Sequence, residues 1–89
     1  MIAMTKSKSK KITEQRFKEQ FAKRLRVVCA ARNVSGKKLA GQIGVSSRNT
    51  YDYLNGKSLP GAFNLALICQ TLEVDASELL GVGVKAVDA

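Results

Sequence analysis

Apolar residues recur along most of the chain at the three- and four-residue spacing of amphipathic helices. The first such stripe begins soon after Thr13, which is a suitable N-cap residue. Asn33 suits the other end, because asparagine tolerates the left-handed conformation found just past a helix. The pattern therefore predicts one long core helix between these two residues. The members of its apolar stripe are Phe17, Phe21, Leu25 and Val28.

Two short helices joined by a tight turn are expected next. Ser35 is a candidate N-cap for a helix from Gly36 to Ile43, and Ser46 for a helix from Ser47 to Leu54. Gly44 can adopt the positive φ that ends the first of them. Helices this short are unstable alone, so apolar side chains must pack in the angle between them. Those expected to do so are Leu39, Ala40, Ile43, Val45 and Tyr53.

Two more helices complete the expected fold. The stretch from Asn55 to Gly61 suits non-helical backbone, and Pro60 can lead into the first turn of a helix from about Gly61 to Leu72. Asp75 and Glu78 have the spacing of a capping box for a final short helix. Because no segment has the alternation of a strand, the sequence predicts an all-α, compact five-helix domain.

The ends of the chain differ from this helical region. Residues 1–13 alternate lysine with serine and lack apolar periodicity, which predicts a flexible basic N-terminal arm. Such an arm can be a solubilising tail, or it can contact phosphates through Lys6, Lys8, Lys10 and Lys11. Residues 14–80 form the expected helical domain. Residues 81–89 are a C-terminal tail or a linker.

Charge is distributed very unevenly along the 89 residues, whose net charge is +8. Residues 1–57 hold 14 basic residues against three acidic ones, whereas residues 58–89 hold one against four. A positive field on one end of a small domain favours a polyanionic partner. Nucleic acid is the first candidate and an anionic membrane surface the second. No apolar run is long enough to span a bilayer.

The chain has few of the residues that catalysis and metal binding use most. It has no histidine and only two cysteines, Cys29 and Cys69, so the usual four nitrogen and sulfur ligands of structural zinc are missing. Ser-His and Cys-His catalytic pairs are excluded for the same reason. We therefore expect a binding protein rather than an enzyme, with no cofactor or metal. Its cysteines are expected to be reduced in the cytoplasm.

The segment VSGKKLAGQIGVSSRNTYDYLNGK, from Val34 to Lys57, resembles the helix-turn-helix domain of phage repressors and Cro, the lambda repressor-like or XRE family. The resemblance extends from about Phe21 to the VDASELL segment that ends at Leu80. It implies a helix-turn-helix over residues 35–54. In such a motif the second helix enters the major groove of double-stranded DNA while the first touches the phosphate backbone.

The resemblance also assigns residues to DNA. The matching base-reading positions are Ser47, Arg48 and Asp52, with Asn49 and Tyr51 as further candidates. Arg48 can bond guanine bidentately, and Asp52 can accept from a cytosine amine or orient Arg48 one turn away. The matching phosphate-binding positions are Lys37, Lys38, Asn55, Lys57 and Gly36.

Four positions depart from the family pattern. Gly36 stands where relatives often have a phosphate-binding glutamine, so a side-chain contact is lost there. Thr50 replaces the usual Ile or Val, and its hydroxyl can bond a carbonyl one turn earlier. Cys29 and Leu54 stand where relatives often pair an arginine with a glutamate. We expect a packed apolar contact in place of that ion pair.

These expectations favour a sequence-specific transcriptional regulator that acts as a repressor. It would be associated with the nucleoid of a bacterial or phage-infected cell. It would act as a homodimer on a palindromic operator, because one short helix reads too few base pairs. The expected dimer contact is Ser77 to Val87, including Leu80 and Val82; Phe63 and Leu67 are a second option. The alternative is an antitoxin or adaptor whose main partner is another protein.

Overall fold

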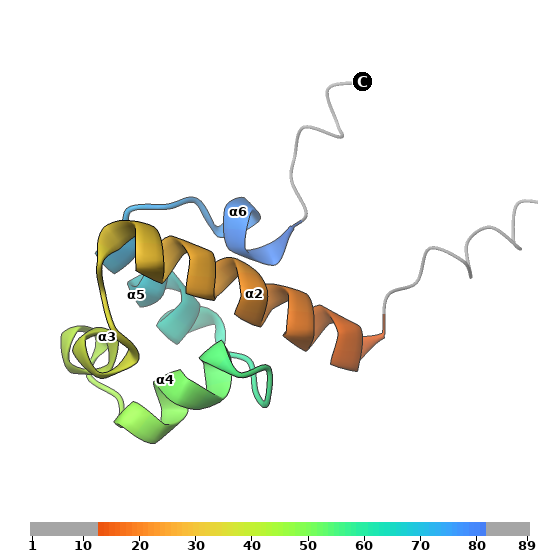
Figure 1. The fold of residues 1–89 in the computed structure, drawn as a ribbon, viewed down its shortest axis with the longest axis horizontal. Coiled ribbons are helices and arrows are strands. Elements are labelled where there is room, and N and C mark those ends of the chain that lie inside the picture. Colours follow the sequence, from red (N-terminus) through yellow and green to blue (C-terminus); the bar gives the residue numbers. More distant parts are fainter. Residues whose placement is uncertain (1–12, 82–89) are drawn as a thin grey trace, which may run out of the picture.

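Helix α2 runs through the middle of the fold, and the other helices pack around it (Figure 1). The computed structural model describes residues 13–81, which contain five helices and no strand, as the sequence predicts. The lysines of the expected arm, Lys6, Lys8, Lys10 and Lys11, lie outside the described residues, as do Val82 and Val87. The helices are α2 (Glu14–Arg32), α3 (Gly36–Ile43), α4 (Ser47–Leu54), α5 (Ala62–Leu72) and α6 (Ala76–Leu80).

The predicted caps of the first three helices are confirmed. The side-chain oxygens of Thr13, Ser35 and Ser46 each accept a hydrogen bond from the backbone N–H three residues later, at 3.1, 3.0 and 3.2 Å. Asn33 and Gly44 end α2 and α3 in the left-handed conformation, with φ of 60° and 78°. These local rules place α3 and α4 where the sequence predicts them.

The ends of α5 and α6 differ in detail from the prediction. Gly61 is the extended N-cap of α5, so the helix begins at Ala62 and Pro60 precedes the cap instead of entering the first turn. Asp75 does hold the N-cap position of α6, but its side chain makes no capping hydrogen bond. The N–H of Glu78 donates to the main-chain carbonyl of Asp75 at 3.0 Å.

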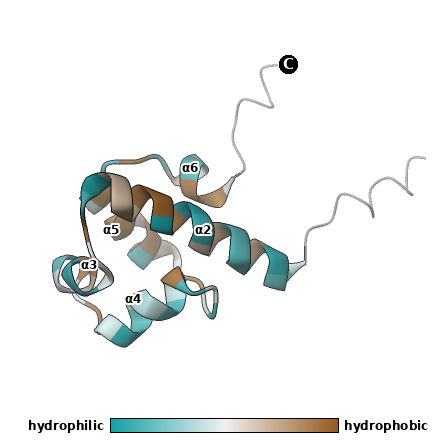
Figure 2. Ribbon diagram, viewed as in Figure 1, coloured by the Kyte–Doolittle hydropathy of each residue, from teal (hydrophilic) through white to brown (hydrophobic). Residues whose placement is uncertain are grey.

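The core lies between α2 and the other helices. Figure 2 shows the apolar residues concentrated in α5 and in the C-terminal half of α2, while most of α4 is polar. Of the predicted α2 stripe, Phe21 and Leu25 are fully buried, whereas Phe17 and Val28 are only partly covered. No helix among residues 13–81 is long and apolar enough to cross a membrane. The fully buried large side chains are Phe21, Leu25, Leu39, Ile68, Leu72, Leu79 and Thr50.

Both cysteines pack in or against this core. Cys29 is buried beside α4, and desolvation raises the pKa of its thiol. Burial, and then the negative charge of Asp75, raise the pKa of Cys69. Cys29 and Leu54 belong to the same buried cluster, as expected for an apolar contact in place of an ion pair. Raised pKa values keep both thiols neutral, which suits a structural role.

Candidate nucleic-acid interface

The angle between α3 and α4 is fixed by a buried set of side chains. Leu39, Ala40 and Ile43 of α3 are at most 6% exposed, and Tyr53 of α4 is equally buried. Val45 in the turn is partly buried against them. Because these residues fill the inside of the angle, the remaining positions of α4 must face outward. The predicted shape-holding residues of the motif are confirmed.

Thr50 ties the two helices together. Its hydroxyl lies 2.9 Å from the carbonyl oxygen of Ser47 and 2.9 Å from that of Gly36, and it can donate to either. The bond to Ser47 is the predicted one. The contact with Gly36 depends on how α4 approaches the first turn of α3, so the sequence did not reveal it. A valine or isoleucine at this position would lack the tie.

The outward face of α4 carries the predicted base-reading residues. Arg48, Asn49 and Tyr51 are exposed, and Ser47 and Asp52 are partly exposed. In Figure 1, α4 lies along the lower edge of the molecule, with no described element beyond it. Among the described residues no ion pair joins Asp52 to Arg48. Asp52 therefore does not orient Arg48 in this structure, and its carboxylate remains available as an acceptor.

Gly36 is the first residue of α3 and is covered by α4. A Cβ atom at this position would lie 2.8 Å from Cε1 of Tyr51 and 3.0 Å from Cδ1 of Leu54. Because real Cβ atoms do not approach other atoms this closely, glycine provides room for the tyrosine ring. Tyr51 itself is 44% exposed, so one part of its ring packs on α3 while the rest faces solvent.

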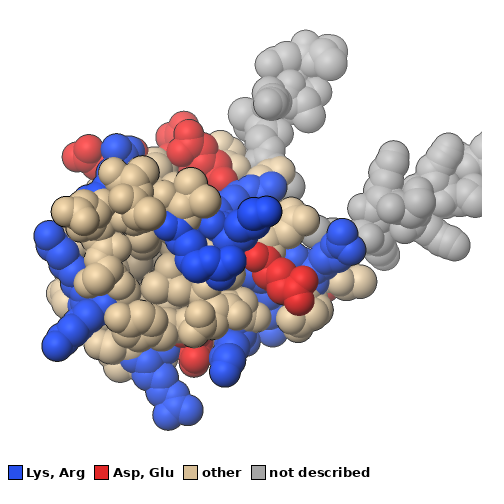
Figure 3. Space-filling view, viewed as in Figure 1, with Lys and Arg blue, Asp and Glu red and all other residues tan. Residues whose placement is uncertain are grey.

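Three lysines and an asparagine flank α4 on two sides. Lys37 and Lys38 are exposed in the first turn of α3, while Asn55 and Lys57 are exposed in the loop after α4. Figure 3 shows lysine and arginine side chains projecting from the side of the molecule that carries α3 and α4. This arrangement is typical of a surface whose flanks meet phosphates while its centre meets base edges.

The loop after α4 is held against α2. The N–H of Lys57 donates to the carbonyl oxygen of Asp52 at 2.9 Å, and Gly56 between them has a φ of 78°. A Cβ atom on Gly56 would be 3.6 Å from the Cα of Glu19 and from the carbonyl oxygen of Lys18. This packing fixes where the chain carries Lys57 relative to α4.

Two arginines of α2 bind the C-terminal ends of other helices, and sequence reasoning missed both. Nη1 of Arg26 donates to the carbonyl oxygen of Leu54, the last residue of α4, at 2.6 Å. Arg32 donates from Nε to the carbonyl of Leu72 at 2.6 Å and from Nη2 to that of Glu73 at 3.0 Å. No spacing in the sequence indicates these contacts, because they join residues 28 to 41 positions apart.

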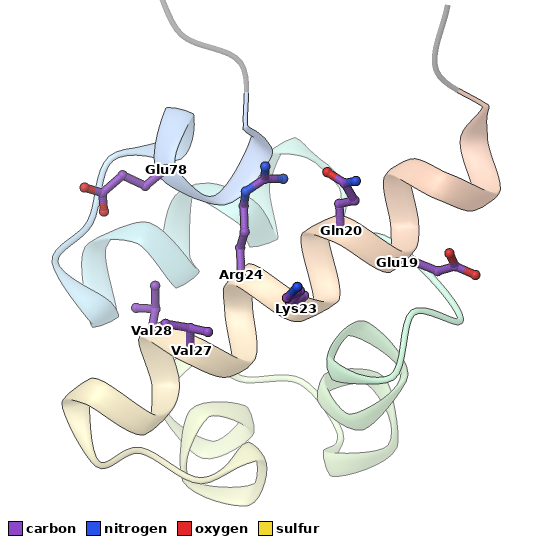
Figure 4. A pocket seen from close by; sticks show the side chains of 7 residues that line it. All are labelled: Glu19, Gln20, Lys23, Arg24, Val27, Val28 and Glu78. Carbon is purple, nitrogen blue, oxygen red and sulfur yellow. The ribbon is translucent and has the colours of Figure 1, made fainter.

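A shallow hollow lies on the other side of α2, beside α6 (Figure 4). Val27 and Val28 supply its apolar part, and Arg24 and Glu78 stand at its edge. Val27 is 62% exposed. In Figure 1, α6 and α4 lie on opposite sides of α2, so this hollow is separate from the outward face of α4.

Residues 24–83 match the family model of the Cro/C1-type HTH DNA-binding domain. This match spans more than half of the chain and includes the whole of α3 and α4. The chain belongs to the Cro/C1-type helix-turn-helix family. The resemblance noted from residues 34–57 is thereby confirmed. As a Cro/C1-type domain the protein binds DNA, and the match contains both helices of the predicted motif, α3 and α4.

Comparison with solved structures supports the fold of this Cro/C1-type domain. It is similar to a crystal structure described as a hypothetical transcription factor, NHTF, from Neisseria, with a TM-score of 0.69. Sequence identity is 19%, and the match covers 86% of this chain and 88% of the other. At that identity the likeness shows the fold alone. No curated protein matches the sequence.

Proposed function

We propose that this Cro/C1-type domain reads a specific duplex DNA site through α4 and regulates transcription, acting as a repressor. The observation that carries the proposal is the outward face of α4, where polar side chains stand between exposed lysines of α3 and of the following loop. The similar Neisseria protein is described as a hypothetical transcription factor, which agrees with this function. Binding, without catalysis, is the proposed activity.

The proposed mechanism assigns roles by exposure and chemistry. Arg48 donates two hydrogen bonds to O6 and N7 of a guanine in the major groove, and Asp52 accepts one from a cytosine amine. Ser47 and Asn49, short and polar, bond neighbouring base edges. The flanking residues hold the phosphate backbone on both sides of the groove and set the register of α4. These flanking residues are Lys37, Lys38, Asn55 and Lys57.

A homodimer on a palindromic operator is part of the proposal. One eight-residue helix contacts only a few base pairs, and a second copy one helical turn away doubles the site. Leu80 of α6 is half-buried, and Glu78 of the same helix lines the hollow that contains the exposed Val27, which supports a contact through α6. Phe63 of α5 is 74% exposed, which supports the second option for the dimer contact, the one through Phe63 and Leu67. Light scattering with full and half operators measures the stoichiometry.

An adaptor or antitoxin is the second candidate function. It is favoured by the hollow beside α6, where the exposed Val27 lies together with Val28, because an apolar patch on a surface suits a protein partner. The exposed basic flanks of α4 have no use in a purely protein-binding adaptor. An antitoxin that binds both DNA and its toxin would need both surfaces.

The decisive experiment is selection of bound duplexes from a random pool, followed by a salt titration on the selected duplex. We expect a dyad-symmetric consensus with half-sites about one helical turn apart and an affinity that falls steeply with salt. Equal binding to all duplexes would refute sequence reading. A consensus without symmetry would refute the dimer while keeping the reading by α4.

Arg48→Ala should weaken binding to the selected duplex by about 1 to 3 kcal/mol and relax one base position per half-site. The reason is the loss of two hydrogen bonds to one guanine. Lys57→Ala is the matched control, because it removes one charge of the same sign from an exposed neighbouring position. It should weaken all duplexes alike and lower the salt slope by about one. Repeating the selection with each variant distinguishes the two; an unchanged consensus for Arg48→Ala contradicts the assignment.

A further inference from the structure

We propose that Arg26 is a positioning residue for sequence reading. Its guanidinium holds the C-terminal end of α4 against α2 and thereby sets the angle at which α4 meets a duplex. The inference rests on the proposed function, because it assigns Arg26 a part in sequence-specific binding. Its basis is a contact between two helices that lie far apart in the sequence.

The contact is short and charge-assisted. Nη1 of Arg26 lies 2.6 Å from the main-chain oxygen of Leu54, in a part-buried position. Hydrogen bonds from a charged donor are shorter and stronger than neutral ones. Leu54 is only 8% exposed, so loss of the guanidinium would leave its carbonyl with little access to water.

Arg26 is the hydrogen-bond donor to the carbonyl of Leu54, whereas the preceding carbonyls of α4 bond to backbone N–H groups. The carbonyls of Tyr51, Asp52 and Tyr53 accept hydrogen bonds from backbone N–H groups of residues 55–58, at 2.9 to 3.4 Å. Among the hydrogen bonds of the described residues, only Arg26 donates to Leu54. The last turn of α4 contains no basic residue of its own. Arg26 therefore also supplies the positive charge that favours this helix end.

Two ties then fix the orientation of α4. The hydroxyl of Thr50, in the first half of the helix, lies 2.9 Å from the carbonyl oxygen of Gly36 of α3 and can donate to it. Arg26 joins its last residue to α2. A short helix held at both places cannot rotate about either one. Without the second tie, the end of α4 can shift, and the side chains on its outward face move with it.

The tie has the same location as the side-chain ion pair that relatives often have, for which the sequence predicts a packed apolar contact in this chain. That pair is absent, because Cys29 and Leu54 are apolar. Arg26 lies one turn before Cys29 on α2, and it donates to the main-chain carbonyl of Leu54 and not to a side chain. In this chain the link between the two helices is made to the backbone.

Arg32 provides a matched control from the same helix. Its Nε lies 2.6 Å from the carbonyl oxygen of Leu72, the last residue of α5. Arg26 and Arg32 thus make the same kind of bond, of the same length, to the ends of two different helices, and Arg32 makes a second bond, to the carbonyl of Glu73, at 3.0 Å. Only the helix held by Arg26 carries the proposed base-reading residues.

The experiment compares Arg26→Met with Arg32→Met, since methionine keeps an apolar stem and removes the donor. Affinity is measured by fluorescence anisotropy for the selected duplex and for a scrambled one, over a range of salt. Both variants should lower Tm, and Arg32→Met at least as much as Arg26→Met, because it removes two hydrogen bonds. Arg26→Met should lower the ratio of specific to scrambled affinity about tenfold with an unchanged salt slope, whereas Arg32→Met should leave the ratio unchanged. Arg26→Lys, with one charged donor, should restore part of the ratio.

Three outcomes overturn the inference. Equal ratios for Arg26→Met, Arg32→Met and the unsubstituted protein would give Arg26 a purely structural role. An equal loss for both variants would reflect general destabilisation. A loss of affinity for both duplexes, with a salt slope smaller by about one, would make Arg26 a phosphate contact.

Amide hydrogen exchange tests the tie without DNA. Arg26→Met should speed exchange of the amides that close α4, those of Asn55, Gly56 and Lys57, and Arg32→Met those of Glu73 and Val74. If the unsubstituted protein shows no preference among duplexes, the proposed function fails while this measurement still reports on the tie. Unchanged exchange at the end of α4 in Arg26→Met overturns the positioning role.

Discussion

Replacing Leu39 with alanine should lower the free energy of unfolding by about 3 to 4 kcal/mol. The side chain is fully buried in α3 and belongs to the cluster that also contains Tyr53 and Leu54 of α4. Its loss removes apolar area and leaves a cavity at the inside of the angle between the two helices. A domain of this size has a total stability of about 5 to 15 kcal/mol, so the change is large. Urea denaturation followed by circular dichroism measures it.

Gly41→Ala in the same helix is the control. A Cβ atom at Gly41 would have nothing within 4 Å, and the backbone there has no positive φ. Alanine should therefore raise the free energy of unfolding by about 0.5 to 1 kcal/mol, because glycine in a helix loses more backbone entropy on folding. If Leu39→Ala cost less than about 1 kcal/mol, the helix-turn-helix would not depend on the core packing described here.

The helix boundaries of the motif could be predicted from the sequence because their causes are local. The side chains of Ser35 and Ser46 each accept a hydrogen bond from the N–H three residues later in the chain. Gly44 takes a left-handed φ that few other residues tolerate. Asp75 shows where this reasoning fails. The same sequence rule applies to it, but its carboxylate makes no capping hydrogen bond. The main-chain bond from Glu78 to Asp75 does not explain this, because Asn49 makes the same bond to the carbonyl of Ser46 and also bonds the Ser46 hydroxyl.

The outward face of α4 was predictable for a related reason. Once Thr50, Tyr53 and Leu54 are assigned to the inside, the helical period leaves Arg48 and Asn49 outside. The hydrogen bonds that join α4 to its neighbouring helices could not be predicted. The bond from Arg26 to the carbonyl of Leu54 depends on the path of α2 past α4, and nothing in the sequence distinguishes Arg26 from the other exposed arginines.

Gly36 was noticed in the sequence, but its role is explained only by the structure. The sequence alone identifies it as a departure from a glutamine that relatives often have, and this suggests only a lost phosphate contact. The structure adds a steric cause, because the ring of Tyr51 and a methyl of Leu54 occupy the space beside its Cα. Gly36 does not have a positive φ, so glycine is present for room and not for conformation.

Gly36→Gln should therefore lower the free energy of unfolding by about 1 to 3 kcal/mol, although it introduces the residue type found in relatives. Its Cβ would lie 2.8 Å from Cε1 of Tyr51, so the ring must move outward, and the buried methyl of Leu54 must also shift. A double-mutant cycle with Tyr51→Ser separates the two contributions. With the ring removed, Gly36→Gln should cost about 1 kcal/mol less, measured by urea denaturation of the four proteins. Strict additivity would show that Tyr51 does not oppose a side chain at this position, and that the tyrosine and the glycine are independent features of the motif.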